Sequence, residues 1–273
     1  MIRFIARTNA SQALRRARSI RECEQAGAVD LATRDLEQAV IGAELIVLCT
    51  PISQMRPLLA EMLPTLHPGA ILTDVGSVKG SVVRDLEPLA AGAGAHFIGS
   101  HPMAGAEKTG VSAARAELFV NAACVVTPSP RSNRPAVRQV EQLWKSIGGR
   151  VLCLSPDLHD ELVSRSSHLP HLVAAQLAQF VLSPEHPNNQ ALLCANGFRD
   201  TTRIASGSPE MWRDITLANR DNLLTALDAF AAGLDQLRRA IKRGDATAIS
   251  RFLETAKSRR DRWSKRAASP SPE

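Results

Sequence analysis

Residues 45–79 read LIVLCTPISQMRPLLAEMLPTLHPGAILTDVGSVK. Two short apolar runs, Leu45 to Cys49 and Ile71 to Val75, enclose a stretch at 52–65 with helical spacing. This alternation is typical of a strand–helix–strand unit, in which the crossover helix brings the chain back so that both strands run parallel. The segment therefore predicts the middle of an α/β sheet.

The same alternation continues on both sides of this unit. Further strands are predicted at 2–6, 96–99, 124–127 and 151–154, and further helices at 10–26, 78–90 and 134–147. The expected architecture over 1–154 is a doubly wound, Rossmann-like α/β domain, with a parallel sheet covered by helices.

After Ser155-Pro156 the strand pattern ends and the rest of the chain is predicted to be helical. The stretch 158–183 is apolar on most faces, and a later helix beginning at Ser208-Pro209 repeats Leu, Phe and Ile at steps of four and three from Leu223 to Ile241. That spacing is typical of a coiled-coil seam or of an ordinary amphipathic helix. We expect an all-helical domain over 155–266 that forms a homodimer, followed by a disordered tail at 267–273.

Composition excludes several classes of protein. The 273 residues are 44% hydrophobic, carry a net charge of +6 concentrated at the two ends, and contain only 4% aromatic residues, which favours solvated basic helix faces over a nucleic-acid partner. No apolar run is long enough to cross a membrane and the first residues do not resemble a signal peptide, so a cytoplasmic location is expected. The five scattered cysteines predict reduced thiols and no metal site.

Three polar, glycine-bearing turns follow directly on predicted strands: 49–51, 74–79 and 100–105. In open α/β sheets, ligands bind outside the carboxyl ends of the strands. Taken singly, Asp74 is a plausible turn residue, Ser77 a helix cap and His101 a capped loop histidine. Their convergence at one sheet edge predicts a ligand site there.

Two segments of the helical half are also unusual. A proline and two histidines interrupt an apolar helix at 167–171, SHLPH, where substrate contact or a kink is a better interpretation than a two-histidine metal site. The segment 197–203, GFRDTTR, is rich in charge and hydroxyls and has neither helical nor strand periodicity. Its arginine, Arg203, is suited either to a surface ion pair or to a bidentate clamp on a carboxylate.

The strings DVGSVKG, GSHPMAGAEKTG, SHLPH, GFRDTTRIASGSPEMWRDI and LANRDNLL occur in this order between residues 74 and 224. In this order and at these separations they resemble the prephenate and arogenate dehydrogenase family, over about residues 30 to 262. The resemblance implies NAD(P)-dependent oxidative decarboxylation of prephenate or arogenate in tyrosine biosynthesis, with tyrosine as a candidate feedback inhibitor.

The resemblance also implies roles for individual residues. His101 corresponds to the histidine that bonds the ring hydroxyl of the substrate, where an imidazole can act as the general base, and Ser77 to a serine at the same hydroxyl. Arg203 corresponds to the arginine that binds a substrate carboxylate. The remaining pocket residues are expected to be Asp200, Glu107, His171 and Trp212.

The sequence departs from the family at its beginning. No G-x-G-x-x-G loop follows a strand, and 1–6 resembles the second strand of such a domain. Without the first strand, the neighbouring strands are expected to have unpaired backbone groups, and the 273 residues are expected to bind dinucleotide poorly and to show little or no activity. Arg7 stands where an acid would bond the ribose of NAD, which favours NADP over NAD. The expected cofactor contacts are Arg7, Thr8, Thr50, Pro51, Asp74 and Gly76.

Two alternatives stay open. The first is a related NAD(P)-dependent hydroxyacid dehydrogenase, which is disfavoured because the helical half offers SHLPH and FRDTTR where those enzymes usually use a lysine. The second is a ligand-binding protein without activity, which would follow from loss of the phosphate loop. The choice between prephenate and arogenate is also open.

Overall fold

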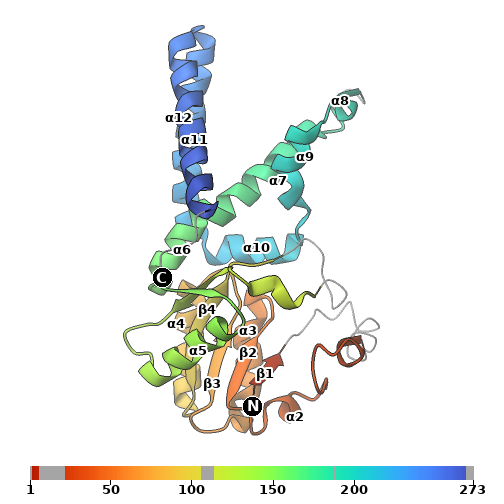
Figure 1. The fold of residues 1–273 in the computed structure, drawn as a ribbon, viewed down its shortest axis with the longest axis vertical. Coiled ribbons are helices and arrows are strands. Elements are labelled where there is room, and N and C mark those ends of the chain that lie inside the picture. Colours follow the sequence, from red (N-terminus) through yellow and green to blue (C-terminus); the bar gives the residue numbers. More distant parts are fainter. Residues whose placement is uncertain (1, 6–21, 106–113, 187–188, 269–273) are drawn as a thin grey trace. The chain divides into compact units, whose positions relative to one another are not determined.

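The computed structural model describes residues 2–5, 22–105, 114–186 and 189–268. The chain divides into two compact units, 1–223 and 224–273. The first unit holds the sheet and the helices around it, and the second holds most of a pair of long helices (Figure 1). The domain boundary at 154/155 stays a prediction.

The described residues of the first unit contain one six-stranded sheet with its strands in chain order. The strands are β1 Ile2–Ile5, β2 Leu45–Leu48, β3 Ile71–Asp74, β4 His96–Pro102, β5 Ala123–Thr127 and β6 Arg150–Cys153. The predicted Rossmann-like α/β sheet is confirmed, but it is not parallel throughout, because β5 runs antiparallel to β4. In the described part of the β4–β5 connection there is only a 3-10 turn, Ala116–Phe119, and a parallel return would need a longer crossover element.

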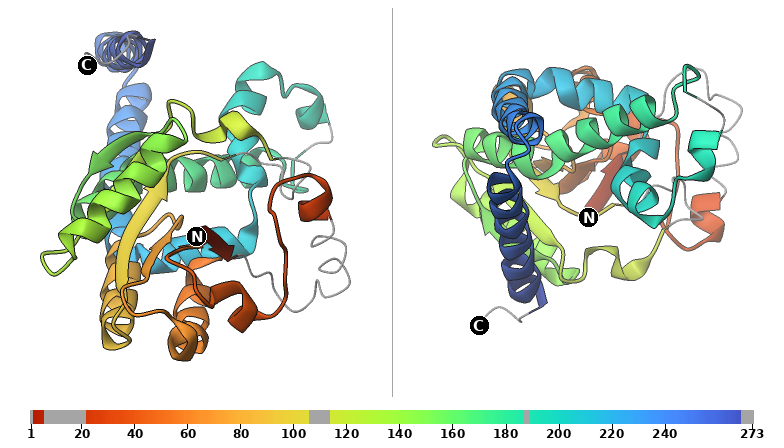
Figure 2. Two further views of the ribbon diagram at one scale, coloured as in Figure 1. Left: turned by 60° about the horizontal axis from the view of Figure 1, so that its bottom comes forward. Right: turned by 90° about the horizontal axis from the view of Figure 1, so that it is seen from above.

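Helices cover both faces of the sheet (Figure 2). Helices α3 Ile52–Met62 and α4 Gly80–Gly92 pack with Ile46 and Leu72 in one core. Helix α5 Arg134–Ser146 packs with Ile71 and Ile98 in the other, where Trp144 is buried. Right-handed crossovers place α3 and α4 on one face, and the reversal of strand direction at β5 places α5 on the opposite face.

The expected gap beside β2 is not present. All four residues of β1 pair in parallel with β2, from Ile2 opposite Leu45 to Ile5 opposite Leu48. The sequence-based expectation of unpaired backbone groups at this position was therefore wrong, because β1 supplies the donors and acceptors that β2 requires. Of the predicted helix at 10–26, residues 22–25 are helical and 10–21 lie outside the described residues.

Several helices that follow β6 in the first unit lie beyond the carboxyl ends of β2 and β3 (Figure 1). The elements that follow β6 in this unit are α6 Pro156–Val163, a π-helical turn Ser164–His168, α7 Leu169–Val181, α8 Asn189–Leu192, α9 Asn196–Thr202, a 3-10 turn Arg203–Ser206, and α10 Pro209–Ala218. The predicted helix at 158–183 is confirmed with a π-helical interruption before Pro170, whose missing N–H prevents a regular α-helical bond. The expectation that 197–203 lacks helix was wrong, because α9 begins at Asn196.

Helices α11 Arg220–Lys242 and α12 Ala246–Ala268 meet at a turn in which Gly244 has a φ of 64°. The single helix predicted from Ser208 is in fact two, since α10 ends at Ala218. Phe230, Leu234 and Ile241 of the predicted seam are exposed in the single chain. Helix α12 continues to Ala268, so the tail predicted from 267 begins too early, and 269–273 lie outside the described residues.

None of the helices within the described ranges combines the length and the apolar character that a membrane span requires.

Candidate active site

A buried ion pair between Lys79 and Asp74 links the ends of β3 and β4. The Asp74 carboxylate accepts hydrogen bonds from the backbone N–H of Gly76 at 2.8 Å and of Ser100 at 3.0 Å, and it pairs with the ammonium of Lys79. The Lys79 Nζ also donates to the Ser100 carbonyl at 2.7 Å. Burial lowers the pKa of Lys79, and the Asp74 charge partly offsets that shift. This network holds the two strand ends in fixed positions.

His101, near the end of β4, is only 7% exposed. Its Nδ1 lies 2.9 Å from Nε2 of His159 on α6, and the two rings meet edge to face. Burial, followed by the nearby Lys79, His159 and His168, holds the pKa of His101 well below its usual 6.5. His101 is therefore neutral near pH 7 and has a lone pair available for a proton.

Asp160 connects this histidine pair to the beginning of α4. Its Oδ1 lies 2.8 Å from Nδ1 of His159 and accepts the Lys79 N–H at 2.7 Å, while its Oδ2 accepts the Gly80 N–H at 2.8 Å. A Cβ at position 80 would lie 2.9 Å from Oδ2, so only glycine allows this close approach. The carboxylate thus satisfies backbone donors at a helix N-terminus, where the helix dipole favours negative charge.

Asn219, between α10 and α11, joins the same network from a third direction. Its Nδ2 donates to the Asp160 carbonyl at 2.8 Å and lies 3.1 Å from Nδ1 of His168. The other ring nitrogen of His168, Nε2, is buried and makes no hydrogen bond within the described structure. Burial lowers the pKa of His168 to about 4, although Asp160 and the backbone of Ser77 partly offset the effect.

His171 and Trp212 form a stacked pair beside His168. Their rings are 3.5 Å apart and nearly parallel, and Trp212 also meets His168 edge to face at 6.1 Å. Gly207 lies against both rings, since a Cβ there would be 2.6 Å from Trp212 Nε1 and 3.2 Å from His171 Cε1. The stack forms an apolar wall next to the buried histidines.

The structure thus brings His101, Ser77, His171 and Trp212 into one region, and their roles stay predictions. Arg203 and Asp200 are on elements that pack against α7, and both side chains are exposed. Among the expected cofactor contacts, Thr50 is buried at the end of β2 and Pro51 precedes α3. Residues Arg7, Thr8 and Glu107 lie outside the described residues.

Asp74 and Gly76 belong to the ion-pair network, in which both carboxylate oxygens of Asp74 are already engaged. This geometry supports a structural role for Asp74 rather than direct contact with a cofactor. Sequence reasoning missed four residues of the network: Lys79, His159, Asp160 and Asn219. Lys79 carried a signal, because it stands five residues after Asp74 in the DVGSVKG string, whereas the other three carried none.

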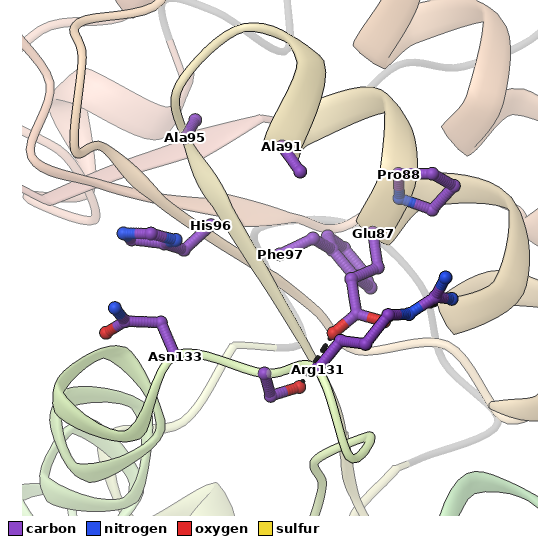
Figure 3. Close-up of a pocket in the computed structure, with 9 residues that line it drawn as sticks. Glu87, Pro88, Ala91, Ala95, His96, Phe97, Arg131 and Asn133 are labelled. Atoms are coloured by element: carbon purple, nitrogen blue, oxygen red, sulfur yellow. Dashed lines mark hydrogen bonds and ion pairs between the residues drawn. The ribbon is translucent and has the colours of Figure 1, made fainter.

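A separate cavity lies elsewhere (Figure 3). It has a volume of about 290 Å³ and is lined by residues that include Glu87, His96 and Arg131. The Glu87 carboxylate there accepts hydrogen bonds from the hydroxyls of Ser129 and Ser132. His96 begins β4, so this cavity is at the amino end of that strand, away from His101. Within the described ranges, no group of three or more His, Cys, Asp or Glu side chains is placed to hold a metal ion.

Residues 13–153 match the family model described as prephenate dehydrogenase, nucleotide-binding domain, and 155–255 match that of the prephenate dehydrogenase dimerization domain. The chain belongs to the prephenate dehydrogenase family. It is 38% identical over 234 residues to cyclohexadienyl dehydrogenase of Zymomonas mobilis, covering 84% of this chain and 79% of that protein. The resemblance found in the sequence motifs is thereby confirmed.

Two further relatives agree. Prephenate dehydrogenase of Bacillus subtilis is 38% identical over 243 residues, which cover 86% of this chain and 64% of the longer B. subtilis protein. The crystal structure of prephenate dehydrogenase from A. aeolicus, in complex with hydroxyphenyl propionate and NAD+, superposes with a TM-score of 0.84 at 30% identity, covering 95% of this chain and 88% of that one.

Proposed function

We propose that this protein catalyses the oxidative decarboxylation of prephenate or arogenate, with hydride transfer to a nicotinamide cofactor, in tyrosine biosynthesis. The observation that carries the proposal is His101: a neutral, buried imidazole at the carboxyl end of β4, oriented by His159, in a chain of the prephenate dehydrogenase family. An imidazole so placed is suited to remove a hydroxyl proton near neutral pH.

Thr50, just after the end of β2, supports binding of a nicotinamide cofactor at this edge of the sheet. Thr50 Oγ1 is buried and, in the part of the chain that the structure describes, has no hydrogen-bond partner, so it can bond a polar group placed over the sheet edge. Pro51 beside it has no polar side-chain atom and its carbonyl accepts the Gln54 N–H at 2.9 Å, so any contact it makes with the cofactor would be apolar. The bound cofactor would accept the hydride from the carbinol carbon of the substrate.

In this proposal the side chains of the site bind the substrate and accept its hydroxyl proton. His101 Nε2 accepts the hydroxyl proton as the carbonyl forms, and Ser77 contacts the same hydroxyl. Loss of the ring carboxylate as carbon dioxide makes the ring aromatic, so this step needs alignment more than a further acid or base. We propose that Arg203 binds a substrate carboxylate and that His171, Trp212 and Asp200 line the pocket; the same role for Glu107 stays a prediction, because that residue lies outside the described residues.

The proposal is tested by His101→Asn, with His96→Asn at the opposite end of the same strand as the matched control. Loss of a general base lowers turnover by about 100-fold or more. Formation of NADH or NADPH from prephenate and from arogenate is followed spectrophotometrically, with far-UV circular dichroism to check folding. Turnover of His101→Asn within a few-fold of the unmodified protein would remove His101 from the mechanism.

The assignment of Arg203 is tested by comparing Arg203→Ala with Arg199→Ala, an exposed arginine on α9. Deleting a clamp on the substrate carboxylate raises KM, by about tenfold or more, and changes kcat little. If the two variants have the same KM, Arg203 does not bind the substrate carboxylate and has only a surface role.

For the cofactor, we propose a preference for NADP, because Arg7 rather than an acid follows β1 in the sequence. Calorimetric titration of NADP and NAD into the unmodified protein and into Arg7→Asp compares the affinities for the two dinucleotides and tests this preference. Tighter binding of NAD by the unmodified protein would contradict the proposed preference.

Adding tyrosine to the turnover assay tests the predicted feedback inhibition.

We also propose that the helical residues form a homodimer. The match to a dimerization domain supports it, as do the large apolar side chains left exposed in the single chain on α7 and α11, Phe180 at 60% and Leu234 at 51%. Sedimentation at micromolar concentration should give the dimer mass. Leu234→Lys should shift the population toward monomer, whereas an unmodified protein that sediments only as monomer would overturn the proposal.

A further inference from the structure

His101, His159 and Asp160 form a continuous line of hydrogen-bonding groups. His101 Nδ1 lies 2.9 Å from His159 Nε2, and His159 Nδ1 lies 2.8 Å from Asp160 Oδ1. His159 is fully buried and Asp160 is 4% exposed. The line begins on β4, runs through α6 and ends at the N-terminus of α4.

The groups around Asp160 determine which nitrogen atoms carry protons. Its two oxygens accept the backbone N–H groups of Lys79 and Gly80, and an ionised carboxylate can only accept. His159 must therefore donate through Nδ1, which leaves its Nε2 bare. His101 must then donate from Nδ1 to that bare nitrogen, which leaves the Nε2 of His101 unprotonated.

A positive charge on His101 would be poorly placed. The ring is buried, and among the described residues the charged or titratable groups that face it are the Lys79 ammonium, His159 and His168, while Asp74 is paired with Lys79. His159 is better placed to hold the charge because its far nitrogen contacts the Asp160 carboxylate. A buried cation requires a paired anion, and in this network that anion is beside His159.

We propose that His159 and Asp160 act as a proton relay behind His101: as His101 Nε2 takes the substrate hydroxyl proton, His101 Nδ1 passes its own proton to His159 Nε2. The O–H bond of the substrate and the Nδ1–H bond of His101 break, and one N–H bond forms on each ring. The charge ends on His159, paired with Asp160, and no electrons move beyond the hydride already assigned. This inference rests on the proposed function, and His159 and Asp160 are positioning residues in it.

The matched variant is His159→Gln, whose side-chain oxygen can reach the position of Nε2 and accept from His101 but cannot take up a proton. We expect kcat to fall about 10- to 100-fold with KM changed less than about threefold. A loss of kcat with KM nearly unchanged separates a defect in the proton-transfer step from general damage to the site, which would also raise KM.

A double-variant test separates the relay from other effects. In the His101→Asn background, His159→Gln should lower residual turnover by less than about twofold, because the relay acts only through His101. An equal loss in both backgrounds would overturn the relay. Unchanged kcat in the single variant would also overturn it, while leaving the proposed function intact.

Two measurements on the unmodified protein remain decisive if His159→Gln fails to fold. The first is the rate in mixtures of light and heavy water, measured where hydride transfer limits turnover. A plot of this rate against the heavy-water fraction should be curved, as expected when two protons move in one transition state. A straight line would overturn the relay. Nitrogen NMR of the free protein at pH 7 should show the proton on Nδ1 of both rings. A proton on Nε2 of His101 would overturn the relay whatever the outcome of the activity assays.

Discussion

Replacing Lys79 with methionine should destabilise the protein strongly, whether or not it binds a ligand. Lys79 and Asp74 are both fully buried, and the methionine keeps the length of the side chain while removing its charge. The Asp74 carboxylate would keep only the N–H donors of Gly76 and Ser100, and the Ser100 carbonyl would lose its Lys79 donor. Breaking a buried pair by removing one partner costs about 3 to 5 kcal/mol.

A loss of that size is a large share of the roughly 5 to 15 kcal/mol by which a folded domain is stable. Urea unfolding followed by far-UV circular dichroism measures it. Lys145→Met is the control, because Lys145 is exposed and pairs at 3.9 Å with the partly exposed Glu141, so its loss should cost at most about 1 kcal/mol. The double variant Asp74→Asn/Lys79→Met removes both charges and should recover part of the loss. If Lys79→Met costs no more than Lys145→Met, the reasoning about the buried pair is wrong.

Three further predictions concern the fold. Gly99→Ala should cost about 1 to 3 kcal/mol, because its Cβ would lie 2.6 Å from Thr127 Oγ1; an unchanged urea midpoint would show that the strands can move apart. Gly233→Ala in α11 should instead add about 0.5 to 1 kcal/mol, because its Cβ meets open space and alanine favours helix; a lower midpoint would contradict this. The pKa of His168 is lowered to about 4 in the folded protein, so between about pH 6.5 and 4 the unfolded ring binds a proton and the folded ring does not. The folded state therefore loses stability as the pH falls through this range, by up to about 3 kcal/mol. Thermal unfolding at pH 7 and pH 4.5 should therefore show a smaller difference for His168→Gln than for the unmodified protein, and equal differences would refute the assignment.

The amino-acid sequence determined the strands and the site edge of this protein. Strands β2 and β3 are short apolar runs that are buried along their whole length. Such runs can be recognised in the sequence because the pattern is local. The turn motifs after β3 and β4 placed Ser77 and His101 at the same edge, since parallel neighbouring strands end together. The family was recognised because several motifs occur together in one order. No single motif would have been enough to identify it.

The tertiary structure decided what depends on contacts between distant parts of the chain. Helix α9 was not predictable from its own residues, because NGFRDTT has no apolar period and the helix packs against α7. The direction of β5 depended on a connection without a predicted crossover helix. His159 approaches His101 across 58 residues, and Asp160 reaches the beginning of α4 across 80. A local pattern encodes which face of an element is buried, whereas the partner of a buried polar group is fixed only when the elements pack together and every donor must find an acceptor.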